Sequence, residues 1–222
     1  MHEILIEEKI LAKNGEIASE NRSFFKERKI FAVNIVSSPG AGKTAIIEKT
    51  VPLIKDKVNL AVIEGDLATD LDARRLLKFG IPVKQITTGK ACHLDAHNIS
   101  HILPWVLEQK GVSLLIIENV GNMVCPAEYD LGESIRVVVM SVAEGDDKPL
   151  KYPAIFSSSD ALLLNKIDLL GHTDFDIDKA KENALKINPY LKILETSCRT
   201  GEGINEWCAF LEGEMTGAEV KA

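Results

Sequence analysis

The stretch 33-VNIVSSPGAGKTAIIEKT-50 decides the fold, because a glycine-rich turn here joins a strand-like apolar run to a helix-like segment. It fits the phosphate-loop template G-x-x-x-x-G-K-S/T at Gly42, Lys43 and Thr44, while Ser37 replaces the first glycine. That glycine serves the turn geometry, so Ser37 can substitute for it if its φ angle is negative. Backbone N–H groups of such loops bind phosphate oxygens. The predicted phosphate site comprises Pro39, Gly40, Ala41, Gly42, Lys43, Thr44 and Ala45.

Further β-rich runs follow this loop and alternate with helix-like stretches; they cover 58–66, 83–89, 113–121, 136–143, 161–168 and 191–197. Several are continuous apolar runs, which are typical of strands covered on both faces. The alternation predicts an α/β fold with a doubly wound, mostly parallel sheet and helices on both faces, as in P-loop NTPases. Ligands of such sheets bind beyond the carboxyl ends of the strands. We divide the chain into an amphipathic helical extension, 1–29, interrupted near Gly15, and a nucleotide-binding domain, 30–222, with inserted metal-binding segments.

Composition excludes several classes of function. A net charge of −7 argues against nucleic acid as a partner, because phosphate backbones recruit basic surfaces. Four cysteines in 222 residues do not form a disulfide framework, so we expect a reducing compartment and a cytoplasmic location. The charged N-terminus lacks the apolar region of a signal peptide, and no apolar run approaches the roughly 18 residues that span a bilayer.

The base is predicted by a second motif, Asn165-Lys166-Ile167-Asp168, which matches the guanine-recognition sequence N-K-x-D at the end of a strand. A carboxylate at Asp168 can accept hydrogen bonds from the guanine N1–H and exocyclic amine, which adenine does not offer together. The stem of Lys166 can lie over the ring. Ser197, Cys198 and Arg199 stand where guanine-binding proteins place a further base-supporting loop, although the stretch is also typical of an ordinary turn.

Magnesium and turnover are assigned to side chains that follow the strands beside the phosphate loop. Lys43 is expected to reach the outer phosphates and Thr44 to bind Mg²⁺ through its hydroxyl. Asp66 and Glu118 are candidate Mg²⁺ ligands, directly or through water, or else caps of the following segments. Gly121 can offer its N–H to the terminal phosphate. We read two further carboxylates, Asp70 and Asp72, as first-turn helix residues in preference to ligands.

A second site is predicted at the same edge, because thiolate and imidazole ligands for Zn²⁺, Ni²⁺ or Cu(I) follow two of the strands. The candidate set is Cys92, His93 and Cys125, with His97 as a fourth. If the stretch from 93 is helical, His93, His97 and His101 share one face. We expect His101 to be solvated or packed. Cys198 and Cys208 are not expected to bind metal.

Three protein ligands leave a tetrahedral metal one position short. A symmetric dimer could complete or share the site by bringing the same edge of a second chain against it. Alternatively, the open position could be where the metal is handed over.

Taken together, the segments SSPGAGKT, EGD, GKACHLDAH, ENVGNMVCP, EGDDKPLKYP and NKID resemble the HypB family of GTPases that serve nickel–iron hydrogenase maturation. The resemblance spans roughly residues 30–212. It implies a SIMIBI-class fold, GTP with Mg²⁺, and a nucleotide-responsive homodimer with interfacial Ni²⁺ or Zn²⁺. It implies nickel delivery to a hydrogenase large-subunit precursor with a HypA-like chaperone as partner. It also suggests that Lys148 touches the nucleotide, within its own chain or across the dimer. The N-terminus lacks the cysteine-rich or histidine-rich tract of some members.

This resemblance makes coupling between nucleotide and metal the leading hypothesis, with slow intrinsic hydrolysis because Asn122 stands where small GTPases have a water-orienting glutamine. Three alternatives remain at this point. The first is a metal-insertion GTPase for another nickel enzyme such as urease. The second is an ATP-dependent partition protein or small-molecule kinase, which the N-K-x-D motif disfavours. The third is a zinc-stabilised dimer that binds nucleotide without significant turnover.

Overall fold

The structure, a computed structural model, describes residues 2–68, 70–89 and 91–221, with side chains described from Glu8 to Ala218 within these ranges. The helices are α1 (His2–Glu27), α2 (Lys43–Ile54), α3 (Leu71–Leu77), α4 (Ala96–Glu108), α5 (Lys148–Lys151), α6 (Pro153–Ser157), α7 (Ile177–Ile187) and α8 (Ile204–Lys221), with short 3₁₀ turns η1 (Cys125–Ala127) and η2 (Ile167–His172). The strands are β1 (Phe31–Ser37), β2 (Leu60–Asp66), β3 (Val83–Thr87), β4 (Leu114–Glu118), β5 (Ile135–Ser141), β6 (Ala161–Asn165) and β7 (Lys192–Thr196).

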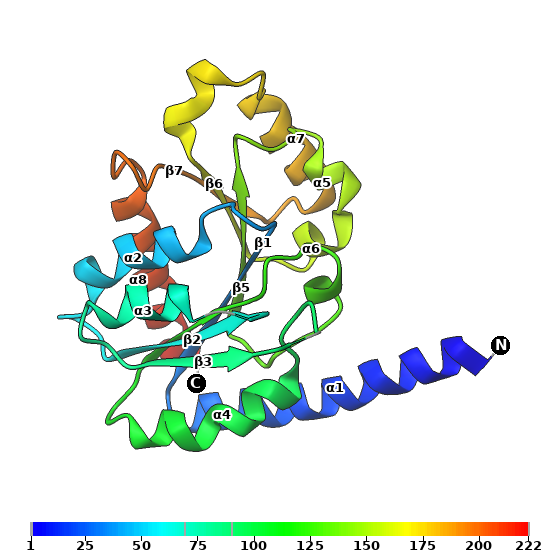
Figure 1. The fold of residues 1–222 in the computed structure, drawn as a ribbon, viewed down its shortest axis with the longest axis vertical. Helices are drawn as coiled ribbons and strands as arrows, with labels where there is room; N and C mark the ends of the chain where they lie inside the picture. The colour runs from blue at the N-terminus through cyan, green and yellow to red at the C-terminus, as the bar shows by residue number, and fades with distance from the viewer. Residues whose placement is uncertain (1, 69, 90, 222) are drawn as a thin grey trace.

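The seven strands form one parallel sheet in the order β3-β2-β4-β1-β5-β6-β7 (Figure 1). Every run that the sequence marked as β-rich contains one of these strands, so the predicted doubly wound sheet is confirmed. The phosphate-loop strand β1 lies at the centre, between β4 and β5. Because all strands are parallel, the segments that leave their carboxyl ends gather along one edge of the sheet. The candidate ligands of both sites follow these ends.

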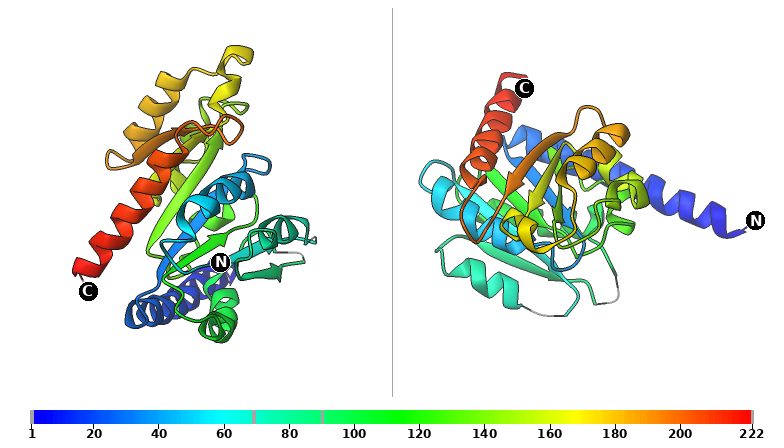
Figure 2. Two further views of the ribbon diagram at one scale, coloured as in Figure 1. Left: turned by 90° about the vertical axis from the view of Figure 1, so that its left-hand side faces the viewer. Right: turned by 90° about the horizontal axis from the view of Figure 1, so that it is seen from above.

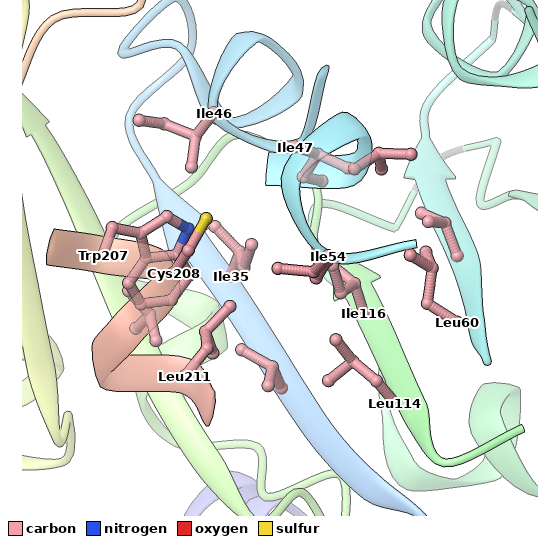
Figure 3. Packing of buried hydrophobic residues seen from close by; sticks show 14 of the residues in the cluster. Ile35, Ile46, Ile47, Ile54, Leu60, Leu114, Ile116, Trp207, Cys208 and Leu211 are labelled. Carbon is pink, nitrogen blue, oxygen red and sulfur yellow. The ribbon is translucent and has the colours of Figure 1, made fainter. Parts of the chain in front are cut away.

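Apolar side chains fill both faces of the sheet, which explains the continuous apolar runs. On one face, α2, α3 and α8 pack on the strands through Ile46, Leu76 and Trp207, among others. Figure 3 shows Ile46 and Trp207 in this layer. On the other face, α1 and α4 cover one half of the sheet, and α6 and α7 cover the other half. Cys208 lies inside the first of these clusters (Figure 3), as expected for a cysteine that is not a ligand.

The extension is a single helix, α1, from His2 to Glu27, so the predicted interruption near Gly15 is wrong. A glycine inside a helix costs only about 1 kcal/mol relative to alanine. Tertiary packing offsets that cost, because Asn14 and Ala18, on either side of Gly15, are buried against the domain. Phe25, two turns after Ala18, is buried as well. The N-terminal part of α1 projects beyond the rest of the molecule, most clearly in the right-hand view of Figure 2. Across the described part of the chain, every helix is too short or too polar to span a membrane.

Candidate functional site

The phosphate loop joins β1 to α2 at the centre of the sheet edge. Gly40 and Gly42 have φ angles of 76° and 107°, in the left-handed region that favours glycine. Ser37 is buried and lies outside that region, so it meets the condition under which serine can replace the missing glycine. Its hydroxyl accepts a hydrogen bond from Lys43 Nζ at 3.1 Å. The substitution therefore gives the loop lysine an internal partner.

Asn165 and Lys166, the first residues of the guanine motif, brace the phosphate loop from β6. The amide of Asn165 donates to the carbonyl of Ala41 at 2.9 Å, and Lys166 Nζ donates to the carbonyl of Gly40 at 2.7 Å. A Cβ atom at Gly42 would overlap the Asn165 amide nitrogen. These contacts join residues that are 124 and 126 positions apart in sequence, so the two motifs form one binding surface.

Asp168 lies beside the loop that follows β7. The hydroxyl of Ser197 donates to Asp168 Oδ1 at 2.6 Å, and Arg199 Nη1 lies 3.9 Å from Oδ2. The thiol of Cys198 points to Asn165 Oδ1 at 3.6 Å, and burial raises its pKa to about 11. The structure thus brings together the residues predicted to hold the base, with the carboxylate of Asp168 fixed by a hydroxyl donor.

An acidic cluster lies on the other side of the phosphate loop. Thr44 Oγ1 donates to Glu118 Oε1 at 2.8 Å, and Glu118 lies with Glu64 and Asp72 so that one carboxylate oxygen of each is within 4.8 Å of the others. Glu64 and Glu118 pair in register on β2 and β4 and are buried. One oxygen of each, Oε2, has no hydrogen-bond partner among the described residues. Buried, unpartnered carboxylate oxygens beside a threonine hydroxyl suit a hard divalent cation such as Mg²⁺.

Sequence reasoning missed Glu64 and undervalued Asp72. The signal for Glu64 was available, because β2 and β4 each carry a single glutamate near the end of an otherwise apolar run. Asp72 lies in the first turn of α3, as expected, and yet faces the cluster. The acidic cluster lines a cavity of about 460 Å³ beside the phosphate loop, and the predicted ligand Asp66 lines it too. Asp66 is nevertheless not part of the three-residue cluster, and its Oδ1 accepts from the Ala68 N–H at 2.8 Å.

Burial raises the pKa of Glu64, and the neighbouring charge of Glu118 adds to the effect. Burial also raises the pKa of Glu118, against the opposing charge of Lys43. Two adjacent buried carboxylates cannot both ionise cheaply without a cation between them. The electrostatics therefore agree with the geometry in favouring a bound cation.

The segment 119–124 connects the acidic cluster to the cysteines and touches the phosphate loop through its residues 121–123. Gly121 lies against Pro39, where a Cβ atom would come within 2.9 Å of the Pro39 Cα. Asn122 forms an isolated bridge with Ser37 and donates from its side chain to the carbonyl of Cys92 at 3.3 Å. Met123 Sδ accepts from Ser38 Oγ at 3.0 Å. A displacement of the phosphate loop would therefore act directly on this segment.

Lys148 begins α5 on the side of the phosphate loop away from the acidic cluster. Its Nζ forms an ion pair with Glu144 at 2.5 Å and a hydrogen bond with Ser38 Oγ. Lys148, which the sequence predicts to touch the nucleotide, thus lies next to the phosphate loop of its own chain. Both Lys148 and Met123 reach Ser38, from the segments that follow β5 and β4, the two strands that flank β1.

The predicted soft-metal residues converge. Cys92 Sγ lies 3.0 Å from Cys125 Sγ and 3.7 Å from His93 Nδ1, and all three ligand atoms are within 4.8 Å of one another. The three side chains are half-buried, and the cysteines are free thiols. The hydrogen bond with Cys92 and burial raise the pKa of Cys125, while burial lowers the pKa of His93. Two close thiols beside a neutral imidazole are a donor set for Ni²⁺ or Zn²⁺.

The histidines do not share one helical face, because α4 begins at Ala96 and His93 precedes it. Asp95, whose own backbone is extended, caps this helix by accepting from the Asn98 N–H at 2.7 Å, and Cys92 and His93 lie in a bend before it. His97 and His101 instead pair with each other, with their Nε2 atoms 3.0 Å apart on the exposed face of α4. His97 is consequently outside the three-residue group, and the His93 ring packs against Tyr129 at a tilt of 40°.

Comparisons with known proteins agree with this arrangement. The family model for the CobW/HypB/UreG nucleotide-binding domain matches residues 31–195. The hydrogenase maturation factor HypB of Azotobacter vinelandii is 50% identical over 207 residues, covering 93% of this chain and 68% of that protein.

Two solved structures are similar in both sequence and fold. HypB of Archaeoglobus fulgidus is 43% identical with a TM-score of 0.86, covering 92% of this chain and 99% of that one. HypB of Helicobacter pylori in complex with nickel is 38% identical with a TM-score of 0.88, covering 92% and 96%. The signal recognition particle receptor FtsY of Elizabethkingia anophelis in complex with GDP is 12% identical with a TM-score of 0.54, covering 86% of this chain and 70% of that one, and shares the fold alone. The predicted fold class is thus confirmed.

Proposed function

This chain belongs to the HypB family of hydrogenase maturation factors, and we propose that it is a GTP-hydrolysing metallochaperone whose nucleotide state controls nickel binding at Cys92, His93 and Cys125. The observation that carries the proposal is the segment 118–125. It begins at the acidic cluster, lies along the phosphate loop and ends at a metal-site thiol. Nucleotide and metal therefore act on the two ends of one short segment.

At the nucleotide end, the proposed roles follow from the contacts. Lys43 and the loop N–H groups bind the phosphates, and Asp168, fixed by Ser197, accepts from the guanine edge. Thr44 and Glu118, with Glu64 and Asp72, would hold Mg²⁺, which supplies charge neutralisation at the phosphates. Intrinsic hydrolysis is slow, because Asn122 is engaged with Val124 and Cys92 and does not orient a water.

At the metal end, nickel is the cargo. Binding a divalent cation to Cys92 and Cys125 requires loss of thiol protons, so uptake is coupled to proton release. A contact of the terminal phosphate with Gly121 would shift Asn122 and with it the loops that carry both thiols. Since such coupling is reciprocal, the metal must change GTP affinity by the same factor as GTP changes metal affinity.

A second copy of the chain completes the arrangement in this proposal. Three ligands leave one coordination position open. Val124, next to Cys125, and Leu67, at the cavity rim, expose apolar side chains at this edge. A homodimer formed there would cover both and share the metal. With a HypA-like chaperone, it would pass nickel to a hydrogenase large-subunit precursor, in a reducing compartment such as the cytoplasm that keeps the thiols free.

The test is sedimentation and calorimetry on the wild type, C92A and C125A, with GTP and Ni²⁺ varied independently and ATP as the nucleotide control. The expected result is dimerisation favoured by both ligands, GTP affinity that depends on Ni²⁺, and loss of both metal effects in the two variants. C208A is the matched control, because Cys208 lies in the core away from both sites. GTP affinity unchanged by Ni²⁺ would contradict the coupling.

Phosphate release distinguishes the remaining alternative. A zinc-stabilised dimer without turnover would show the same metal-dependent sedimentation and no release of phosphate from GTP. The proposal requires slow release that disappears in K43A, because Lys43 is the loop lysine aimed at the phosphates.

A further inference from the structure

The metal-bearing segments leave different strands, and their relative position depends on few direct contacts. Cys92 and His93 lie between β3 and α4, whereas Cys125 lies after β4. Besides the thiol contact, the His93 ring packs against Tyr129, Asn122 donates to the carbonyl of Cys92, and Asn119 accepts from the Leu94 N–H at 2.9 Å. These bonds lie on the side of the phosphate loop. The same two segments are also held by α1.

Two asparagines of α1 each reach both segments. Asn14 accepts from the Ala96 N–H at 2.9 Å and donates to the carbonyl of Asp130 at 2.8 Å. Asn21, about two helical turns after Asn14, donates to the carbonyls of Ala96 at 2.8 Å and Leu131 at 3.0 Å. Ala96 follows His93 by three residues, and Asp130 follows Cys125 by five. Each amide thus spans the gap between the histidine-bearing and the cysteine-bearing segment.

The contact between α1 and the second segment is unusually close. Gly132 has a φ angle of 87°, and a Cβ atom there would lie 2.5 Å from the Ala18 carbonyl oxygen and 2.7 Å from Asn21 Cβ. Only glycine fits under the helix without displacement. Asn14 and Asn21 are 8% and 1% exposed, so their amides are withdrawn from water and depend on these partners.

We propose that Asn14 and Asn21 are positioning residues for the metal site, and that α1 clamps the two segments at the separation at which Cys92, His93 and Cys125 can bind one ion. This inference rests on the proposed function of that cluster. Ala18 and Phe25 already give α1 an apolar face that covers the sheet. Covering the sheet therefore does not require the two buried asparagines. Buried amides that join two loops fix register, as outer partners of metal ligands do elsewhere.

The experiment compares N14A and N21A with N188A in the full chain. Asn188 is the matched control, because it also donates to two backbone carbonyls, of Phe156 and Ser159, at 3.2 and 2.8 Å, but lies away from the metal segments. Co²⁺ binding is followed by calorimetry and by the thiolate-to-metal charge-transfer absorption. We expect about tenfold weaker binding and an altered absorption in N14A and N21A. N188A should lose thermal stability yet bind Co²⁺ within about twofold of wild type.

Two outcomes separate this inference from the proposed function. If C92A and C125A bind Co²⁺ like the wild type, the cluster is not the metal site and both proposals fall. If the cysteine variants lose Co²⁺ while N14A and N21A keep wild-type affinity and absorption, only the clamp is wrong.

Hydrogen exchange on the wild type provides a measurement that does not depend on whether a variant folds. Coupling is reciprocal, so metal binding should slow exchange of the Ala96 amide, which is held by Asn14, and of α1 around residues 14–22. Unchanged exchange at these amides on saturation with Co²⁺ would contradict the clamp.

Discussion

The phosphate loop and the cysteine–histidine cluster lie at one edge of the same sheet but are positioned by different means. The loop is part of the strand–helix junction at the centre of the sheet and is braced by buried Lys43, Asn165 and Glu118. The cluster lies on half-buried loops that depend on side-chain bonds from Asn122 and α1. The difference suggests a rigid nucleotide site beside a metal site that small displacements can open or close. The predictions below test this contrast, starting with the largest effect.

Substituting Gly42 should abolish nucleotide binding and spare metal binding. In G42A the new Cβ atom would overlap the Asn165 amide and occupy a φ of 107°, so the loop cannot keep its shape. We expect at least a 100-fold loss of GTP affinity by calorimetry, or about 3 kcal/mol, given the cost of overlap added to left-handed strain. Gly40, with a φ of 76° and open space around it, is the matched control, and G40A should lose far less. Equal loss of GTP and Co²⁺ affinity in G42A would show that the two sites are not separately positioned.

Substituting Gly132 should have the complementary effect on the metal side. G132A combines a φ of 87° with contact against α1, so we expect about 3 kcal/mol of destabilisation in urea unfolding and weaker Co²⁺ binding. G80A is the control, because Gly80 has a φ of 72° and no atom within 4 Å, and should cost about 1 kcal/mol with unchanged Co²⁺ affinity. A G132A protein with wild-type Co²⁺ affinity would indicate that the cluster does not depend on α1.

The buried acid Glu64 should make the nucleotide-free protein less stable as the pH rises. Burial and the charge of Glu118 raise its folded-state pKa, so the folded state binds the proton more tightly than the unfolded state. Its favourable contribution is complete below the unfolded pKa of about 4.3 and is lost as the pH rises towards the folded value. E64Q, which cannot ionise, should therefore be more stable than wild type by about 1–2 kcal/mol near neutral pH. A gain that does not grow between pH 5 and pH 8 in thermal unfolding would contradict this account. In the same variant, Mg²⁺ should raise the melting temperature less than in wild type.

The sequence predicted the nucleotide edge better than it predicted what supports the metal edge, and the reason is physical. Strand ends and loop motifs are local, so residues such as Lys43, Asp168 and Cys125 can be located from the runs that precede them. Glu64 and Asp72 join the acidic cluster through the register of β2 and the turn of α3, which local patterns do not specify. The continuity of α1 through Gly15 depends on Asn14 and Asn21 reaching residues 75 to 116 positions away. The four-residue spacing groups His97 with His93, but the Asp95 cap starts α4 at Ala96 and leaves His93 outside the helix.

The smallest expected effect distinguishes the exposed from the buried contacts of α1. Arg22 donates to both carboxylate oxygens of Asp130 at 2.7 Å, but the two side chains are 50% and 44% exposed. Burial alone would raise the pKa of Asp130, but the hydrogen bonds from Arg22 and the Gly132 N–H hold that pKa below its usual value. The pair of Arg22 and Asp130 therefore stabilises the fold above about pH 4, and this stabilisation is lost in acid. Solvent screening limits that contribution to less than about 1 kcal/mol in R22A, and 1 M salt should shrink it further. Asp130 keeps its bond from the Gly132 N–H at 2.8 Å, so the segment stays in place and Co²⁺ affinity should be unchanged. A fall in Co²⁺ affinity in R22A as large as that in N21A would mean that charge at the surface, and not the buried amides, holds α1 to the metal segments.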